Sequence, residues 1–434
     1  MNRRPGTHPD DRAILALALP ALGALAADPL YSLADTAFIG RLGTPQLGAL
    51  AVGTAAFTAS FWLFSFLAYG VTPRVARAFG AGDDSAAART GVQAMLLALA
   101  IGVLLTLLGV AFAGPVVRLL GARGEVAEFA EPYLRIRILA ATSVLMVQVG
   151  NGWLRGAQDT RTPFLVTVAG AALNVVLDYI LIYPAGWGVR GAAWATVIGQ
   201  TFSAAVFVAI LMRRMRGTRW GWDRTEARAL GRVGFDLAVR TGSLLVALTI
   251  ATSVAARMGQ VALGSWQITM QVFLLLALTL DSIAIAAQAL VGLRLGAGVP
   301  RSATAVGRRL MWWGAALGVA LGVLLLLLSR PIATIFSSDP EVISATASLL
   351  VWLALVQPLG AIAFTLDGIL IGASDTRFLA VAMAASSALY VGLALLALDR
   401  GWGTAGLATG MTVWLVARAA TTGARWRGER WAST

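Results

Sequence analysis

Long apolar runs, separated by short polar links, follow one another along nearly the whole chain. Each run is continuous, unlike the alternating ten-residue segments of a membrane β-barrel. In lipid, backbone polar groups must be satisfied within their own segment, so the runs predict membrane-spanning helices. There are twelve of them, at about 13–37, 47–72, 89–113, 127–150, 162–183, 191–212, 233–256, 262–290, 307–328, 342–366, 377–398 and 403–422.

Composition supports an all-α integral membrane protein. The chain has 434 residues, of which 58% are hydrophobic and 13% charged, and its mean hydropathy is +0.77. The net charge is +13 without any lysine. Because the arginines lie in links between apolar runs, they indicate membrane orientation and not nucleic-acid binding. There is no cysteine, which excludes disulfides and thiol catalysis.

Arginines are concentrated in alternate links, which predicts the orientation. The links after the second, sixth and eighth spans are the richest, and the intervening links carry mostly single arginines. By the positive-inside rule the rich links are cytoplasmic, and both termini then lie in the cytoplasm. The polar tail 1–12 leads directly into a long span without a cleavage site, so we expect no cleaved signal peptide. The sixth link is the richest, with Arg213, Arg214, Arg216, Arg219, Arg224, Arg228 and Arg232.

Short motifs recur at an almost constant offset. An offset of six spans, an even number, gives two halves of the same orientation, related by an axis along the membrane normal. We therefore predict two pseudo-symmetric six-helix bundles, 13–212 and 233–422, around a central cavity, with a linker at 213–232 and tails at 1–12 and 423–434. The matches are Arg41-Leu42-Gly43 with Arg257-Met258-Gly259, Gly80-Ala81-Gly82 with Gly296-Ala297-Gly298, and Gly156 to Arg161 with Gly372 to Arg377, all at 216, and Gly186-Trp187-Gly188 with Gly401-Trp402-Gly403 at 215.

Few carboxylates fall inside the spans, and two of these are candidates for chemistry. Asn174 and Asp178 lie four residues apart, on one side of the helix predicted at 162–183. Asp35 lies in the second half of the first span. Carboxylates in a bundle interior mark ion or substrate paths, and two brought together raise each other's proton affinity. The same oxygens suit a hard monovalent cation, so residue type leaves proton and sodium coupling open.

Several motifs in this order resemble the multidrug and toxic compound extrusion (MATE) transporters, and the chain is most similar to their DinF-like branch. The resemblance runs from about residue 12 to 420. It implies an exporter without a cofactor in the plasma (inner) membrane of a prokaryote, coupled to H⁺ or Na⁺. The motifs are Asp35 to Gly40 with Leu42-Gly43, Gly80 to Asp83, Asn174 to Asp178, and Leu366 to Ala373.

Carried over by position, the resemblance implies a cation-coupling site in the N-terminal bundle. It also makes Pro20 a place where the first helix bends, and Pro20 by itself predicts a kink because it removes a backbone hydrogen bond. The implied coupling residues are Asp35, Asp178, Asn174, Asn151, Thr196 and Tyr133, and a sodium ion would take Asp35, Asn174, Asp178 and Thr196.

The NorM-like branch instead uses acidic residues of the C-terminal bundle, and this chain departs from that pattern. Its seventh span offers Asp236 only near the cytoplasmic start, where we expect an ion pair with Arg240, four residues later. Asp281 and Asp367 are secondary candidates for transport or for structural bonding. Apolar side chains that would suit an adaptable pocket, or else core or lipid contact, are Met146, Trp153, Met270 and Phe273.

These observations predict a monomeric secondary exporter that works by antiport and alternating access on hydrophobic or cationic small molecules such as drugs. A flippase or exporter of a lipid-linked or amphiphilic metabolite is the alternative, but it would need a strongly basic cavity, and few arginines fall inside the spans. Enzyme motifs for metalloproteases, serine hydrolases and phosphate-binding loops are absent. At offset 216, Tyr390 replaces Asn174 and Ala394 replaces Asp178, so we expect coupling in the N-terminal bundle alone.

Overall fold

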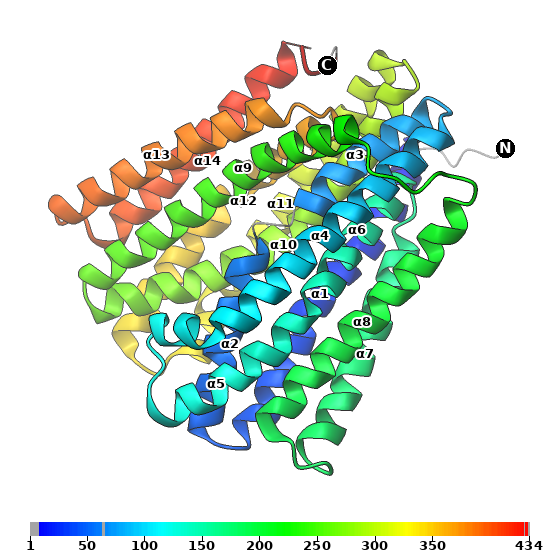
Figure 1. The fold of residues 1–434 in the computed structure, drawn as a ribbon. Helices are drawn as coiled ribbons and strands as arrows, with labels where there is room; N and C mark the ends of the chain where they lie inside the picture. Colours follow the sequence, from blue (N-terminus) through cyan, green and yellow to red (C-terminus); the bar gives the residue numbers. More distant parts are fainter. Residues whose placement is uncertain (1–7, 63–65, 429, 433–434) are drawn as a thin grey trace. The chain divides into compact units, whose positions relative to one another are not determined.

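The computed structural model describes residues 8–62, 66–428 and 430–432, and every regular element in these ranges is a helix (Figure 1). The first half of the chain contains α1 (Asp11–Gly40), α2 (Thr44–Trp62), α3 (Phe66–Gly80), α4 (Asp84–Leu119), α5 (Gly124–Arg137), the 3₁₀ turn η2 (Ile138–Ala140), α6 (Ala141–Gly156), α7 (Arg161–Ile182) and α8 (Gly188–Arg214). The second half contains α9 (Arg224–Arg257), α10 (Gln260–Gly296), α11 (Pro300–Phe336), α12 (Pro340–Gly372), α13 (Thr376–Asp399), α14 (Gly403–Arg427) and η3 (Arg430–Ala432).

All twelve predicted spans are helical over their described residues. The described parts of the second belong to α2 and α3, and the fourth is divided between α5 and α6 at the short turn η2. Within the described residues, ten helical stretches are long and apolar enough to cross a membrane, with α5 to α6 counted as one stretch. The prediction of an all-α membrane protein with twelve spans in two similar halves is confirmed.

The internal repeat extends to backbone conformation. Left-handed φ values occur at equivalent positions of the two halves, +70° at both Gly82 and Gly298, and +63° at Gln158 against +61° at Ser374. Non-glycine residues rarely adopt this conformation. Its return 216 residues later shows that the turn before α7 and the turn before α13 are built in the same way.

The chain divides into two compact units, Leu19–Gly234 and the combination of Met1–Ala18 with Phe235–Thr434. We call them the N-terminal and the C-terminal unit. The first residues of α1 belong to the C-terminal unit, where Asp11 accepts hydrogen bonds from Arg309 Nε at 2.6 Å and from Trp313 Nε1 at 2.9 Å. The remainder of α1 belongs to the N-terminal unit.

Glycines allow close helix crossings in each unit. A Cβ atom on Gly152 of α6 would lie 2.7 Å from the carbonyl oxygen of Ala68 in α3. A Cβ atom on Gly368 of α12 would lie 2.6 Å from the Cα of Ala284 in α10. These four residues are related by the 216-residue offset. Small residues bring helix backbones together where lipid provides no hydrophobic drive for association.

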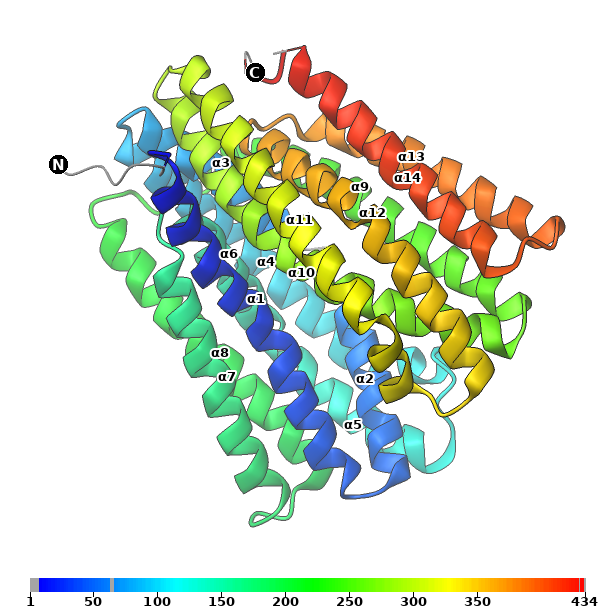
Figure 2. The same cartoon turned by 180° about the vertical axis from the view of Figure 1, so that it is seen from behind.

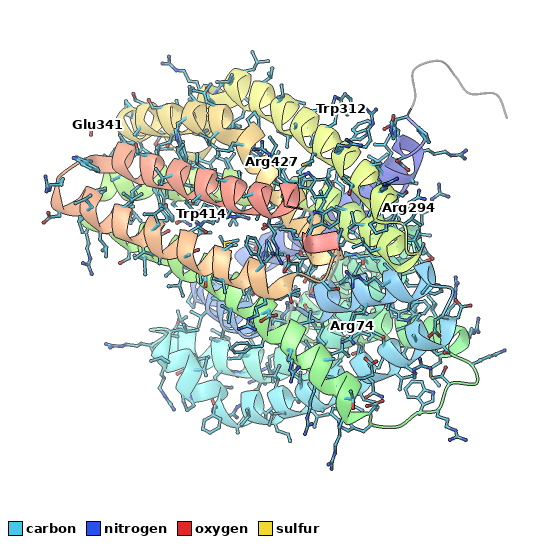
Figure 3. All side chains as sticks on the ribbon, turned by 90° about the horizontal axis from the view of Figure 1, so that it is seen from above. Arg74, Arg294, Trp312, Glu341, Trp414 and Arg427 are labelled. Carbon is cyan, nitrogen blue, oxygen red and sulfur yellow. The ribbon has the colours of Figure 1, made fainter. Side chains whose placement is uncertain are left out.

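Each unit has its own apolar core. In the N-terminal unit α7 and α8 lie side by side, and α13 and α14 do so in the C-terminal unit (Figures 1 and 2). Trp414 is fully buried and extends from α14 toward α13, where it stacks on Tyr390 with ring centroids 6.0 Å apart (Figure 3). The ring of Tyr390 on α13 therefore faces the interior of its own unit.

Candidate functional site

A pair of carboxyl groups lies in the interior of the N-terminal unit. Asp35 comes from α1 and is 5% exposed, and Asp178 comes from α7 and is fully buried. The two side chains share a hydrogen bond. Two carboxylates have only acceptors, so this bond requires a proton on one of them. Asp178 Oδ1 has no hydrogen-bond donor among the described residues.

Asn174 links the two carboxyl groups to α8. In the orientation that satisfies its whole side chain, its Nδ2 donates to Asp35 Oδ1 at 3.2 Å and to Asp178 Oδ2 at 3.3 Å. Its Oδ1 then accepts from the hydroxyl of Thr196 at 3.3 Å and from the Thr196 backbone N–H at 3.1 Å. Four of the residues predicted for coupling are therefore joined in one buried network.

Tyr133 of α5 belongs to the same cluster. It is 1% exposed, hydrogen-bonds to Thr54 of α2 at 3.4 Å, and interacts electrostatically with both Asp35 and Asp178. One turn later on α5, Arg137 is 6% exposed and also interacts with both carboxyl groups. Sequence reasoning missed Arg137, and no local signal separates it from Arg135, which is exposed.

Asn151 is not part of these hydrogen bonds. It lies half-buried on α6, and its Oδ1 has no hydrogen-bond partner among the described residues. Pro20 lies inside α1 as expected, and a second proline, Pro29, lies nine residues later in the same helix. Both prolines precede Asp35 and remove backbone hydrogen bonds from α1.

The C-terminal unit fills the equivalent space with core side chains. The 216-residue offset pairs Asp35 with Ala251 and Asp178 with Ala394, and Asn174 corresponds to Tyr390. All three counterparts are buried in one hydrophobic cluster. Among the described residues, these three positions of the second half thus carry no carboxyl or amide group.

The C-terminal unit has a different buried charge cluster, which corrects one expectation. Asp367 Oδ2 accepts hydrogen bonds from Arg240 at 2.6 Å and from Arg418 at 2.8 Å. The expected pair between Asp236 and Arg240 is wrong, because Asp236 accepts instead from the hydroxyl of Thr376 at 2.8 Å. Arg240 therefore pairs with Asp367 of α12 and not with Asp236, which lies one turn away on α9.

The other secondary candidates are mostly core residues. Asp281 is half-buried on α10 and interacts electrostatically with Arg418. Trp153 is 2% exposed and donates from Nε1 to the carbonyl of Ala87 at 3.0 Å. Met146 packs against the core of the N-terminal unit, and Met270 and Phe273 belong to the core of the C-terminal unit.

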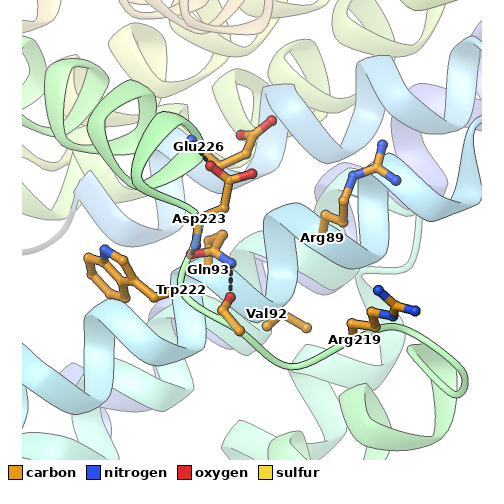
Figure 4. Close-up of a pocket in the computed structure, with 8 residues that line it drawn as sticks. Arg89, Val92, Gln93, Arg219, Trp222, Asp223 and Glu226 are labelled. Atoms are coloured by element: carbon orange, nitrogen blue, oxygen red, sulfur yellow. Dashed lines mark hydrogen bonds between the residues drawn. The ribbon is translucent and has the colours of Figure 1, made fainter.

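A cavity of about 200 Å³ lies where the link between α8 and α9 passes α4 (Figure 4). Gln93 of α4 holds this link, donating to the carbonyl of Gly221 at 2.6 Å and accepting from the Asp223 N–H at 3.1 Å. Arg89 and Arg219 also line the cavity, but none of the carboxyl-pair residues does. The cavity is therefore a feature of the link and not of the buried network.

The buried network combines carboxyl, amide and hydroxyl groups. Such a set holds a proton between two carboxyl oxygens, or presents oxygen ligands to a hard cation. Within the described residues there is no group of three or more His, Cys, Asp or Glu that would hold a metal ion.

Comparison with known proteins identifies the family. The MatE family model matches residues 20–180 and 242–396. DNA damage-inducible protein F of Escherichia coli is 33% identical over 96% of this chain and 92% of its own, and Protein DETOXIFICATION 44, chloroplastic, of Arabidopsis thaliana is 32% identical over 95% and 82%. A solved outward-facing multidrug resistance MATE transporter of the MOP superfamily has a TM-score of 0.88 at 23% identity, covering 99% of this chain and 100% of its own. The chain therefore belongs to the MATE family of multidrug efflux transporters, and its relatives include the DinF-type protein.

Proposed function

We propose that this chain exports hydrophobic or cationic small molecules in exchange for protons bound by Asp35 and Asp178. The observation that supports this most directly is the hydrogen bond between their carboxyl groups, which needs one proton and lies in a water-poor interior. Asn174 donates to both groups and therefore favours the ionised form once the proton has left.

The proposed cycle links protonation to alternating access. Protein open to the outside binds a proton at the pair, and the changed charge and hydrogen bonding favour release of the substrate. Protein open to the cytoplasm loses the proton and binds new substrate. A ligand shifts a conformational equilibrium only through different affinities for the two states, and protonation of a buried carboxyl group supplies such a difference. The arginine distribution favours a cytoplasmic position for both termini.

Sodium is the second candidate ion, because Asp35, Asp178, Asn174 and Thr196 bring several oxygen atoms together.

Export of a lipid-linked or amphiphilic metabolite is the second candidate function. The buried arginines do not favour it, since Arg240 and Arg418 are both paired with Asp367 and Arg137 lies beside the carboxyl pair.

The test is transport in proteoliposomes with proton and sodium gradients imposed separately. We expect a proton gradient alone to drive drug accumulation, and Asp35→Asn and Asp178→Asn to abolish that accumulation. Asp399→Asn is the matched control, because Asp399 is exposed at the end of α13, where it pairs with Arg400. Full proton-driven transport by both site variants would refute the site, and transport driven only by sodium would replace the proton.

A further inference from the structure

Arg137 is a buried cation beside the carboxyl pair, and it is held by three helices. Its guanidinium hydrogen-bonds to Tyr31 of α1 and lies 4.6 Å from the centre of the Phe57 ring of α2. Tyr133 lies one turn earlier on α5, the helix that carries Arg137. Asp35 lies one turn after Tyr31 on α1, so α1 carries both a hydrogen-bond partner of Arg137 and one carboxyl group of the pair.

The charges of this cluster balance when one proton is bound. A guanidinium stays charged at every physiological pH. Two carboxyl groups that share one proton carry a single negative charge, and this charge neutralises Arg137. Loss of the proton leaves one uncompensated negative charge, and a second proton would leave one uncompensated positive charge. Because unpaired charge is costly in a buried site, the cluster favours the state with one bound proton over the states with none or two.

Arg137 also has unused hydrogen-bonding capacity. Its Nε and Nη1 atoms are buried and have no hydrogen-bond partner among the described residues. Buried donors without acceptors are costly, and a carboxylate is the acceptor that a guanidinium binds most strongly. In the protonated pair, the oxygens of Asp35 are engaged with Asp178 and Asn174.

We propose that Arg137 is a positioning residue that binds the Asp35 carboxylate when the shared proton leaves. The O–H bond of the pair breaks, the proton passes to water, and an N–H···O bond forms between Arg137 and Asp35. Repulsion between the two carboxylates drives the same movement. This inference rests on the proposed proton exchange at Asp35 and Asp178.

The consequence for α1 follows from its prolines. Pro20 and Pro29 each remove a backbone hydrogen bond from the helix before Asp35. A shift of Asp35 from Asp178 toward Arg137 would exchange a tie between α1 and α7 for a tie between α1 and α5. Arg137 would thereby convert loss of a proton into a movement of a weakened helix.

Among the described residues, the titratable groups that interact with Arg137 are Asp35 and Tyr31 from α1, Tyr133 from α5 itself, and Asp178 from α7. The contributions of α2 and α8 are Phe57, Thr54 and Thr196, which do not titrate. A change in the pH profile on substitution of Arg137 therefore reports on the carboxyl pair.

The experiment measures proton-driven drug accumulation and gradient-free counterflow in proteoliposomes as functions of pH. Removing a cation beside a carboxyl pair makes the pair keep its proton to higher pH, typically by about 1–3 pH units. We expect Arg137→Gln to move the midpoint of the counterflow profile upward by that amount and to lower accumulation at least about tenfold at neutral pH. Arg137→Lys, which retains the charge, should restore most of the profile.

Arg135→Gln is the matched control, because Arg135 lies two residues earlier on α5, is 53% exposed, and pairs with Glu131 at 2.7 Å. It should behave as the unchanged protein. If Arg137→Gln does not fold, Tyr31→Phe provides the test: loss of its hydroxyl frees Arg137 for Asp35 and should move the profile to lower pH.

An unchanged profile for Arg137→Gln, or for Tyr31→Phe where that variant is needed, would overturn the role of Arg137. Failure of the proposed function would look different: the unsubstituted protein itself would accumulate no drug in response to a proton gradient. The inference about Arg137 would then fail with it.

Discussion

Asp367 is predicted to hold the C-terminal unit together, and Asp367→Asn tests this. Asp367 and Arg418 are almost completely buried, with side chains 4% and 2% exposed, and Arg240 is 15% exposed. The substitution keeps the shape of the side chain but removes a negative charge that contacts both guanidinium groups. Arg418 would stay beside the rings of Trp414 and Phe364, at 4.6 and 5.1 Å, without its carboxylate.

The expected loss follows from the two bonds. Hydrogen bonds to charged groups contribute about 1.5–3 kcal/mol each, so two give about 3–6 kcal/mol. The asparagine oxygen can still accept a hydrogen bond, so part of this free energy is retained, but the buried guanidinium groups lose the negative charge of Asp367. Breaking one side of a buried ion pair costs about 3–5 kcal/mol, and we expect Asp367→Asn to lower the free energy of unfolding by that amount.

The assay is reversible unfolding in mixed micelles with increasing SDS, followed by tryptophan fluorescence. Arg418→Met should cost less than Asp367→Asn, because the remaining pair of Asp367 and Arg240 is neutral. Asp399→Asn is the control, since Asp399 and its partner Arg400 have side chains 80% and 65% exposed, and such pairs contribute about 0–1 kcal/mol. If Asp367→Asn is as stable as Asp399→Asn, the structural role assigned to Asp367 is incorrect.

Three further predictions concern packing, the link and a helix cap. Gly152→Val and Gly368→Val should each destabilise the protein by about 1–3 kcal/mol, because the new side chain would force α6 away from α3 or α12 away from α10. A variant with the same thermal stability as the unchanged protein would contradict the close crossing at that glycine. Gln93→Ala should speed tryptic cleavage at Arg216 and Arg219, because the link between α8 and α9 loses both hydrogen bonds to α4. Gln200→Ala on α8 is the control. Equal cleavage rates for the two variants would show that Gln93 does not hold the link. Hydrogen bonds from the Ser85 hydroxyl and the Ala86 N–H lower the pKa of Asp83 below its usual 3.8. A carboxyl group whose pKa is lower in the folded than in the unfolded state stabilises the protein at pH above the unfolded-state pKa. This stabilisation is lost as the pH falls through the folded-state pKa. The difference in melting temperature between the unchanged protein and Asp83→Asn should therefore disappear only at pH well below 3.8. A difference that stays constant through this acid range would refute the cap.

The sequence by itself determined the helices and the repeat. In lipid, continuous apolar runs can satisfy their backbone only as helices, so all twelve spans could be predicted. Motifs at offset 216 predicted two halves of the same fold, and they also placed Tyr390 and Ala394 where the first half has Asn174 and Asp178. The polar network could be predicted in outline because amide and carboxyl groups are rare inside such spans.

Only the tertiary structure decided which charges meet. Arg135 and Arg137 lie two residues apart in one helix, yet they point to opposite environments, one solvated and one buried beside the carboxyl pair. Arg240 had a local partner at helical spacing in Asp236, but it pairs with Asp367 from another helix. A buried carboxylate depends on cations for its stability far more than one that can be solvated, and burial is a property of packing that helical spacing does not contain.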